Sequence, residues 1–247
     1  MREIDGMTAV VTGGGGAIGS VAAETLVDLG AYVVIVGRGE ERLRRVADKH
    51  PGRIHPFSMD IADTEAWDGL RRWIEEQMSG PARVLVTAAG LNHRAPFVES
   101  SPQQWEEMWR TNVLGTMLAA HTLLPGMLSA GFGRMIFVSS AGAHIGLTER
   151  SGYTATKGAV EAFARSLAAE VALAGVTVNC IAPGVVPTEL NQKWLDSRPD
   201  IRDAMLRAVP AGRFGHPGEL AAAFRFLVQS EYSQGSTVVV DGGWTAV

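Results

Sequence analysis

The segment 7–19, MTAVVTGGGGAIG, decides the fold of this chain. Its first six residues are mostly apolar or β-branched, as in a strand that is covered on both faces. Four glycines follow, and a helical pattern begins near Ala17. Glycines let the backbone approach a phosphate closely, and the unpaired N–H groups at a helix start attract an anion. The segment therefore predicts a strand–turn–helix unit that binds a dinucleotide pyrophosphate, with a ligand-free tight turn as the alternative.

Outward from this unit, short β-branched runs alternate with longer helical patterns. Strands are expected at 7–12, 32–36, 53–58, 83–87, 133–139, 175–181 and 236–240, and helices at 17–29, 39–49, 63–78, 102–130, 151–174 and 217–229. Such alternation is typical of a parallel sheet with right-handed crossovers and helices on both faces. We therefore expect one doubly wound α/β domain over residues 1–247, with a seven-stranded parallel sheet. The segment 187–215 is rich in proline and charge, and we expect it to be a substrate-loop insertion over one edge.

Composition narrows the classes of function. The net charge is −4 and 19% of the 247 residues are charged, so no basic surface for nucleic acid is expected. Cys180 is the single cysteine, which excludes an internal disulfide and suits a reducing, cytoplasmic compartment. The uncharged stretch 171–188 contains asparagine and prolines, so we expect no membrane association. The six histidines are scattered without metal-ligand spacing, and no metal site is predicted.

The end of the second expected strand indicates which dinucleotide is bound. NAD requires an acidic residue there to accept hydrogen bonds from the ribose hydroxyls. This strand instead ends Val36-Gly37-Arg38, and no acid occurs before Glu40. A guanidinium at position 38 could hold the 2′-phosphate of NADP, or it could be an ordinary solvated cation. We therefore expect NADP(H) to be favoured over NAD(H).

Tyr153 and Lys157 are four residues apart in a helical pattern, so they share a helix face. Hydride transfer to a carbonyl leaves an oxygen that needs a proton. Lowering a phenol pKa from ~10 to ~7 takes ~4 kcal/mol, which one ammonium at ~4 Å supplies at an effective dielectric of ~20. The pair therefore predicts an acid/base centre. A core tyrosine beside a lysine that extends to the surface is the alternative reading.

Taken in order and at their spacing, these motifs resemble the short-chain dehydrogenase/reductase family over residues 7–243. The similar stretches are Thr12–Gly19 for its cofactor loop, Asp60-Ile61 for its adenine-contacting pair, Thr87–Gly90 for its Asn-Asn-Ala-Gly, Asn112, Ser140 and Tyr153-x-x-x-Lys157 for its catalytic residues, Pro183-Gly184 with Thr188 for its nicotinamide loop, and Asp241–Gly243 for its C-terminal turn. Two departures stand out. Ala17 replaces a family glycine, and Thr87-Ala88 replace two asparagines that brace the sheet and touch the cofactor.

The resemblance implies a fold, roles and an assembly. It implies a single Rossmann-type domain in which Tyr153 exchanges the proton and Lys157 lowers the pKa of Tyr153 and holds the nicotinamide ribose. Ser140 would orient the substrate oxygen, and Asn112 would anchor a water of a proton relay. The implied cofactor contacts are Gly13, Gly15, Gly16, Ile18, Gly19, Arg38, Asp60, Ile61, Ala89, Gly90, Tyr153, Lys157, Pro183, Gly184, Val186 and Thr188. A homotetramer that pairs helices 102–130 and 151–174 is also implied.

The resulting hypothesis is an NADP(H)-dependent oxidoreductase that interconverts a small ketone and a secondary alcohol. Two alternatives remain: a non-catalytic NADP(H)-binding regulatory protein on the same scaffold, and an NAD-dependent sugar-acid or polyol dehydrogenase. The stretch 92–97, NHRAPF, resembles gluconate 5-dehydrogenase-type relatives. His93 and His144 are candidates to line the substrate pocket, and Arg94 and Arg150 could recognise an acidic group; exposed loop residues are the alternative for all of them.

Overall fold

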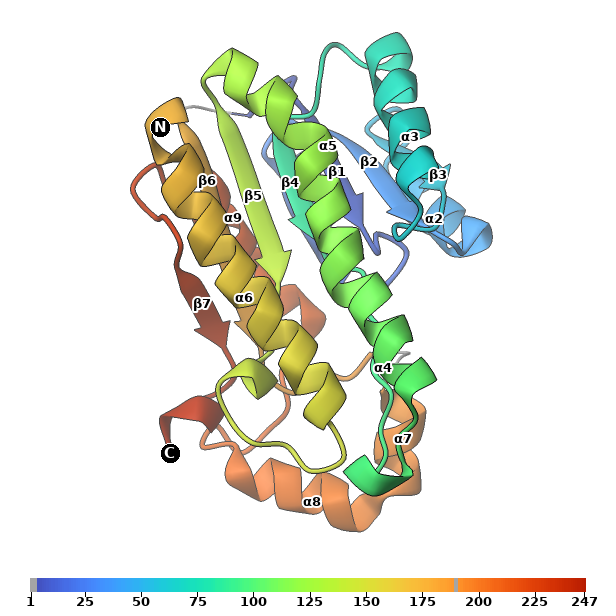
Figure 1. The fold of residues 1–247 in the computed structure, drawn as a ribbon, viewed down its shortest axis with the longest axis vertical. Helices are drawn as coiled ribbons and strands as arrows, with labels where there is room; N and C mark the ends of the chain where they lie inside the picture. The colour runs from blue at the N-terminus through green and yellow to red at the C-terminus, as the bar shows by residue number, and fades with distance from the viewer. Residues whose placement is uncertain (1–3, 189–190) are drawn as a thin grey trace.

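The computed structural model of the chain describes residues 4–188 and 191–247. Its strands are β1 (Thr8–Thr12), β2 (Tyr32–Gly37), β3 (Ile54–Ser58), β4 (Val84–Thr87), β5 (Gly133–Val138), β6 (Val176–Pro183) and β7 (Thr237–Val240). They form one sheet in the order β3-β2-β1-β4-β5-β6-β7, and every neighbouring pair is parallel (Figure 1). The predicted seven-stranded parallel sheet is confirmed.

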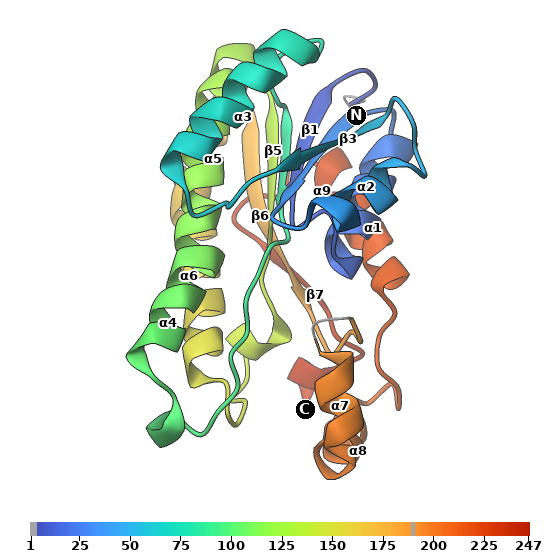
Figure 2. The same cartoon turned by 90° about the vertical axis from the view of Figure 1, so that its right-hand side faces the viewer.

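Helices cover both faces of the sheet, as Figure 2 shows. The helices are α1 (Ala17–Asp28), α2 (Glu40–Ala47), α3 (Thr64–Gln77), α4 (Pro102–Met108), α5 (Gly115–Ala130), α6 (Ser151–Val171), α7 (Gln192–Ser197), α8 (Pro199–Ala208) and α9 (Ala221–Gln229). Alternate residues of each strand point to opposite faces. Val10 of β1 therefore joins the core under α3, α5 and α6, whereas Ala9 and Val11 join the core under α1, α2 and α9. Burial on both faces explains why the central strands β1, β2 and β4 are almost wholly apolar, whereas the edge strand β3 is half-exposed and mixed in composition.

One helix differs from its sequence pattern. The pattern 102–130 predicts a continuous helix, but the structure contains a π-helical turn, Trp109–Leu114, between α4 and α5. The start agrees with expectation, because Ser101 and Gln104 form a reciprocal capping box. A π turn carries one extra residue per turn and frequently occurs at functional sites. Here it contains Asn112, so the irregularity coincides with a residue that the sequence assigns to catalysis.

The run Pro102–Ala130 is also long and apolar enough to cross a membrane, judged by length and composition alone. Its most apolar window is 39% buried in the structure. The buried part packs on β4, β5 and α3, so this helix is part of the main core. This packing explains the apolar residues on the inner side of the helix. Apolar residues on its outer side, such as Met117 and Leu128, are exposed.

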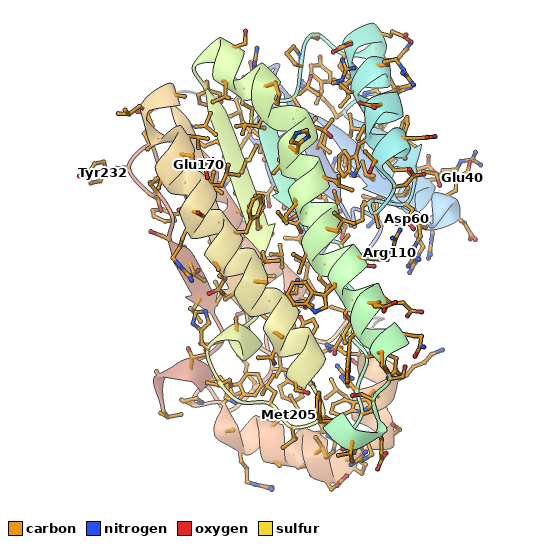
Figure 3. All side chains as sticks on the ribbon, viewed as in Figure 1. Glu40, Asp60, Arg110, Glu170, Met205 and Tyr232 are labelled. Atoms are coloured by element: carbon orange, nitrogen blue, oxygen red, sulfur yellow. The ribbon has the colours of Figure 1, made fainter. Side chains whose placement is uncertain are left out.

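The segment 187–215 lies beyond the carboxyl ends of the strands and contains α7 and α8 (Figures 1 and 2). Its residues 189–190 lie outside the described part of the chain. Leu195 and Val209 belong to a small separate core with Val185 and Trp244, and Met205 points into the same region from α8 (Figure 3). The segment is therefore a helical cap that is held by its own apolar contacts.

Candidate active site

The site begins where the chain reverses its winding direction. β1 and β4 are neighbours, and the strands added after each run outward to opposite edges of the sheet. In such sheets ligands bind at the carboxyl ends beside this switch point. The glycine loop after β1 lies there against the segment after β4, because Ala89 N donates to Thr12 Oγ1 at 3.3 Å. The fold therefore forms a dinucleotide site from two loops that the sequence singled out.

Close backbone contacts explain why this loop contains glycine. Gly13 has φ +67°, and a Cβ atom there would lie 2.6 Å from the amide nitrogen of Ala89. A side chain at Gly19 would overlap the carbonyl oxygen of Gly13. Any larger residue at these two positions would push the loop away from β4 and from the start of α1. Ala17 occupies the first turn of α1, outside these contacts.

The N-terminus of α1 is suited to an anion. Gly16 is its N-cap, no side chain caps it, and the first turn contains no acid. The first N–H groups of the helix therefore point outward without a side-chain partner, next to the positive end of the helix dipole. Gly15, Gly16 and Ile18 all belong to this loop and first turn. The chemistry of these donors fits a pyrophosphate.

Arg38 follows β2 and is exposed at the same edge of the sheet, and Asp60 and Ile61 follow β3. The sequence reasoning missed Arg42, which lies in the first turn of α2. A Cβ on Gly15 would be 3.0 Å from Arg42 Cβ, so this arginine lies directly against the glycine loop. The sequence signal that could have identified Arg42 is its place in the first turn of the helix that follows β2.

On the other side of the switch point, the loop after β6 carries Pro183, Gly184, Val186 and Thr188. Gly184 N donates to Val240 O at 2.9 Å, which joins the loop to β7. Asn191 braces its far end by accepting from Thr188 N at 2.8 Å and donating to Val186 O at 2.9 Å. This loop therefore has a defined shape at the carboxyl end of the sheet.

The four predicted catalytic residues come from three regions of the fold. Asn112 lies on the π turn, Ser140 follows β5, and Tyr153 and Lys157 lie one turn apart at the start of α6. Ser140, not its neighbour Ser139, acts as a hydrogen-bond partner of the Tyr153 side chain. The hydroxyl of Ser139 turns toward α6 and donates to Lys157 O at 3.4 Å.

Lys157 is buried and is anchored at the end of β5, where Nζ donates to Val138 O at 2.7 Å. Burial lowers the pKa of its ammonium to about 8, and the nearby Cys180 and Glu161 oppose this effect. Gly90 lies beside it, because a Cβ on Gly90 would be 3.7 Å from Lys157 Nζ. The segment after β4 therefore links the glycine loop to the catalytic lysine.

The electrostatics of Tyr153 differ from the sequence expectation. Burial raises the pKa of its phenol, and the groups that lower it are the Ser140 hydroxyl and the cations Arg150 and Arg94. Lys157 Nζ lies 5.8 Å from the Tyr153 ring centroid and is bonded to a carbonyl. The simple estimate for an ammonium at ~4 Å from the phenol therefore does not describe this geometry. Burial therefore favours the protonated form of this phenol.

Asn112 connects three elements through its side-chain amide. Nδ2 donates to Leu91 O and to Thr156 Oγ1, both at 2.9 Å, and Oδ1 accepts from Leu91 N at 2.7 Å. Both amide hydrogens are thus used within the protein, and one lone pair of Oδ1 remains for a further donor. These bonds fix the loop after β4 against α6, one residue before Lys157.

The remaining sequence candidates fall into two groups. His93 and His144 each face a glutamate: His93 Nε2 lies 2.8 Å from Glu107, and His144 Nε2 lies 3.1 Å from the buried Glu161.

Among residues 4–188 and 191–247, no group of three or more histidine, cysteine or acidic side chains is arranged to hold a metal ion. Arg94 and Arg150 are turned inward near Tyr153, as their effect on its pKa indicates.

An uncapped helix start at the switch point, together with the tyrosine, serine and lysine described above, is typical of a nicotinamide-dependent oxidoreductase. The family model described as short chain dehydrogenase matches residues 7–199. The chain belongs to this family. Carbonyl reductase family member 4 of Danio rerio is 34% identical over 95% of this chain and 96% of its own length.

Two further comparisons extend this likeness over the whole chain. The 3-oxoacyl-acyl-carrier-protein reductase of Vibrio cholerae is 31% identical over 98% of this chain and 98% of its own length. The crystal structure of a gluconate 5-dehydrogenase from Burkholderia cenocepacia, in complex with NADP and tartrate, matches with a TM-score of 0.91 and 32% identity. That match covers 98% of this chain and 96% of that chain.

Proposed function

We propose that the protein is an NADP(H)-dependent oxidoreductase that interconverts a ketone and a secondary alcohol, with Tyr153 as proton donor and acceptor. One observation carries the proposal: the Tyr153 phenol, with Ser140 as its hydrogen-bond partner, lies one helical turn from a buried lysine that is bonded to the carboxyl end of β5. A regulatory protein would need the dinucleotide site alone, so this group of side chains favours an enzyme.

The residues that would hold the dinucleotide lie along the carboxyl ends of the strands. The N–H groups at the start of α1 would bind the pyrophosphate, Asp60 and Ile61 would contact the adenine, and the loop 183–188 would hold the nicotinamide end. Lys157, beside Gly90, would donate to the nicotinamide ribose. A bound nicotinamide supplies or accepts the hydride.

The protein itself provides the proton and the alignment of the substrate. In reduction, Tyr153 gives its proton to the substrate oxygen as the carbonyl carbon gains the hydride; in oxidation it takes the alcohol proton. Burial raises the pKa of the Tyr153 phenol, so the phenol carries the proton that reduction requires. Arg94, Arg150 and the Ser140 hydroxyl act in the opposite direction and favour the phenolate that oxidation requires. The Ser140 hydroxyl would donate to the same substrate oxygen and stabilise the developing charge.

Preference for NADP(H) is supported by two cations near the first βαβ unit. Arg38 is exposed just beyond β2, and Arg42 lies against Gly15 of the phosphate loop. A Cβ at Gly37 would meet only Leu43, at 3.8 Å, so the strand end leaves space for a ligand. A guanidinium recognises a phosphate through several N–H donors at once, and two of them would hold the 2′-phosphate. The related gluconate 5-dehydrogenase structure carries NADP.

The experiment that tests the proposal replaces Tyr153→Phe. We expect turnover of ketones with NADPH, followed at 340 nm, to fall roughly 10²- to 10⁴-fold while NADPH affinity stays unchanged, because only the proton donor is lost. Tyr232→Phe is the matched control, since Tyr232 projects into solvent far from the site (Figure 3). Full activity of Tyr153→Phe, or a wild type inactive on all ketones and alcohols, would contradict the proposal.

A further inference from the structure

Two arginines from separate loops meet on one tryptophan beside the catalytic tyrosine. Arg94 lies in the loop between β4 and α4, Arg150 is the N-cap of α6, and Trp194 lies on α7. The guanidinium carbon of Arg94 lies 4.0 Å from the Trp194 ring centroid, and that of Arg150 lies 5.3 Å from it. We call Arg94 and Arg150 the arginine pair. Both cations act electrostatically on Tyr153, so they lie near the phenol.

The backbone holds the two loops together. Ala95 N donates to Glu149 O at 3.1 Å, which joins the residues that follow Arg94 and precede Arg150. Glu149 has φ +62°, a left-handed conformation that is strained for a non-glycine residue and that clusters at binding sites. The approach of the two cations is therefore built into the fold.

The arginine pair is partly buried and forms no ion pair among the described residues. Arg94 Nε is shielded from solvent and has no hydrogen-bond partner within the described part of the chain. Neither arginine forms an ion pair at 4.0 Å or less with a carboxylate of residues 4–188 or 191–247. Burial and repulsion by Arg150 lower the pKa of Arg94 to about 10. A surface arginine normally keeps its head group in water, so two inward-facing ones call for a negative partner.

Stacking on Trp194 also leaves the useful part of each guanidinium available. The ring occupies a flat face, and the N–H donors at the edge remain free for a planar bidentate acceptor. Glu149 is the acid that acts electrostatically on both arginines. These two arginines and Glu149 together leave one positive charge unbalanced, which a monoanionic carboxylate balances and a dianionic phosphate monoester exceeds.

We propose that the arginine pair binds a carboxylate of the substrate, so that the reaction proposed above acts on a hydroxy acid and its keto acid. This inference rests on the proposed function, because the carboxylate would hold the substrate with its reacting carbon at Tyr153. It names Arg94 and Arg150 as specificity-determining residues. Trp194 is a positioning residue, and it makes the helical cap formed by α7 and α8 part of the substrate site.

The kinetic test compares short aliphatic hydroxy acids with their own primary amides, with NADP⁺ as oxidant. We expect the wild type to prefer the acids, and Arg94→Gln and Arg150→Gln each to reduce kcat/KM for the acids roughly 10²-fold while the amides are affected little. Arg207→Gln, an exposed arginine on α8, is the matched control. Equal turnover of acids and amides, or an equal loss for both in the variants, would overturn the inference and leave the proposed function standing.

Binding measurements separate failure of this inference from failure of the proposed function. Calorimetric titration of a hydroxy acid into the wild type and into Arg94→Gln, each with NADP⁺ present, needs no turnover. Binding that is lost in the variant supports the carboxylate site even if no alcohol is oxidised. Absence of binding to the wild type, or tighter binding of a phosphate monoester of matched length, would contradict the assignment.

Discussion

At the scale of single residues, Lys157 is a charged group kept where its charge is costly. Its pKa of about 8, against an ordinary value of 10.5, means that folding disfavours the ammonium. A shift of this size corresponds to about 3 kcal/mol of stability. The bond to Val138 O and the nearby Glu161 offset only part of this cost, and the proposed role of Lys157 at the nicotinamide ribose accounts for its presence. Stability given up at a reactive site is a common compromise in enzymes.

Lys157→Met should therefore stabilise the protein while abolishing activity. The gain at pH 7 is expected to be about 1–3 kcal/mol, because losing the bond to Val138 O offsets part of it. The free-energy cost of burying the Lys157 ammonium is full below pH 8, where the lysine is charged in both the folded and the unfolded protein. This cost disappears as pH rises toward 10.5, where the unfolded lysine also loses its proton. Urea unfolding at pH 7 and at pH 10 measures the difference, with exposed Lys193→Met as control. A variant less stable than the wild type at pH 7 would contradict the expectation.

At the scale of elements, the ends and irregular turns hold the chemistry. The π turn directs Asn112 toward the loop after β4 and toward Thr156 of α6, and thereby sets the distance between two segments of the site. Its apolar periodicity resembles that of an ordinary helix, so the sequence pattern 102–130 predicted no interruption. The bonds that stabilise the turn join residues far apart in the chain, which explains why local spacing could not reveal it.

The turn from β2 into α2 should set the choice of cofactor. We expect Arg38→Ala and Arg42→Ala each to lower kcat/KM for NADPH roughly 10- to 100-fold, because each loses a charge-assisted contact with the 2′-phosphate. The values for NADH should change little. Arg45→Ala, an exposed arginine on the same helix, is the control. A wild type that prefers NADH, or equal losses with both cofactors, would show that these arginines do not read the phosphate.

At the scale of the whole molecule, the outer side of α5 explains why helix 102–130 is so apolar. Leu114, at the end of the π turn, and Met117 and Leu128 of α5 are each at least 40% exposed and fall on one stripe of this helical segment. Such a stripe is typical of a surface that pairs with another subunit. It lies on the helix through which the family resemblance implies a homotetramer.

We therefore expect the protein to sediment as a homotetramer and this stripe to contribute to its assembly. The double variant Leu114→Glu, Met117→Glu should shift the mass toward smaller species, because two charges would be buried unpaired in the interface. Light scattering after size exclusion measures the mass, and circular dichroism checks the fold. Glu41→Lys, which alters an exposed charge on α2, should leave the mass unchanged. A monomeric wild type would contradict the expectation.

The sequence by itself determined the parallel sheet, the glycine loop and the pairing of Tyr153 with Lys157. Each depends on local rules: strand and helix periodicity, the backbone freedom of glycine, and the four-residue spacing that aligns side chains on a helix. These rules act over a few neighbouring residues, so a linear pattern records them.

Only the tertiary structure decided the electrostatics and the composition of the site. It brought Arg42 against the phosphate loop, and it assembled Arg94, Arg150 and Trp194 from three distant segments. It also reversed the expected direction of the Tyr153 pKa shift, because burial outweighs the nearby cations. Desolvation and long-range contacts depend on which surfaces the fold brings together, and residue spacing alone does not contain that information.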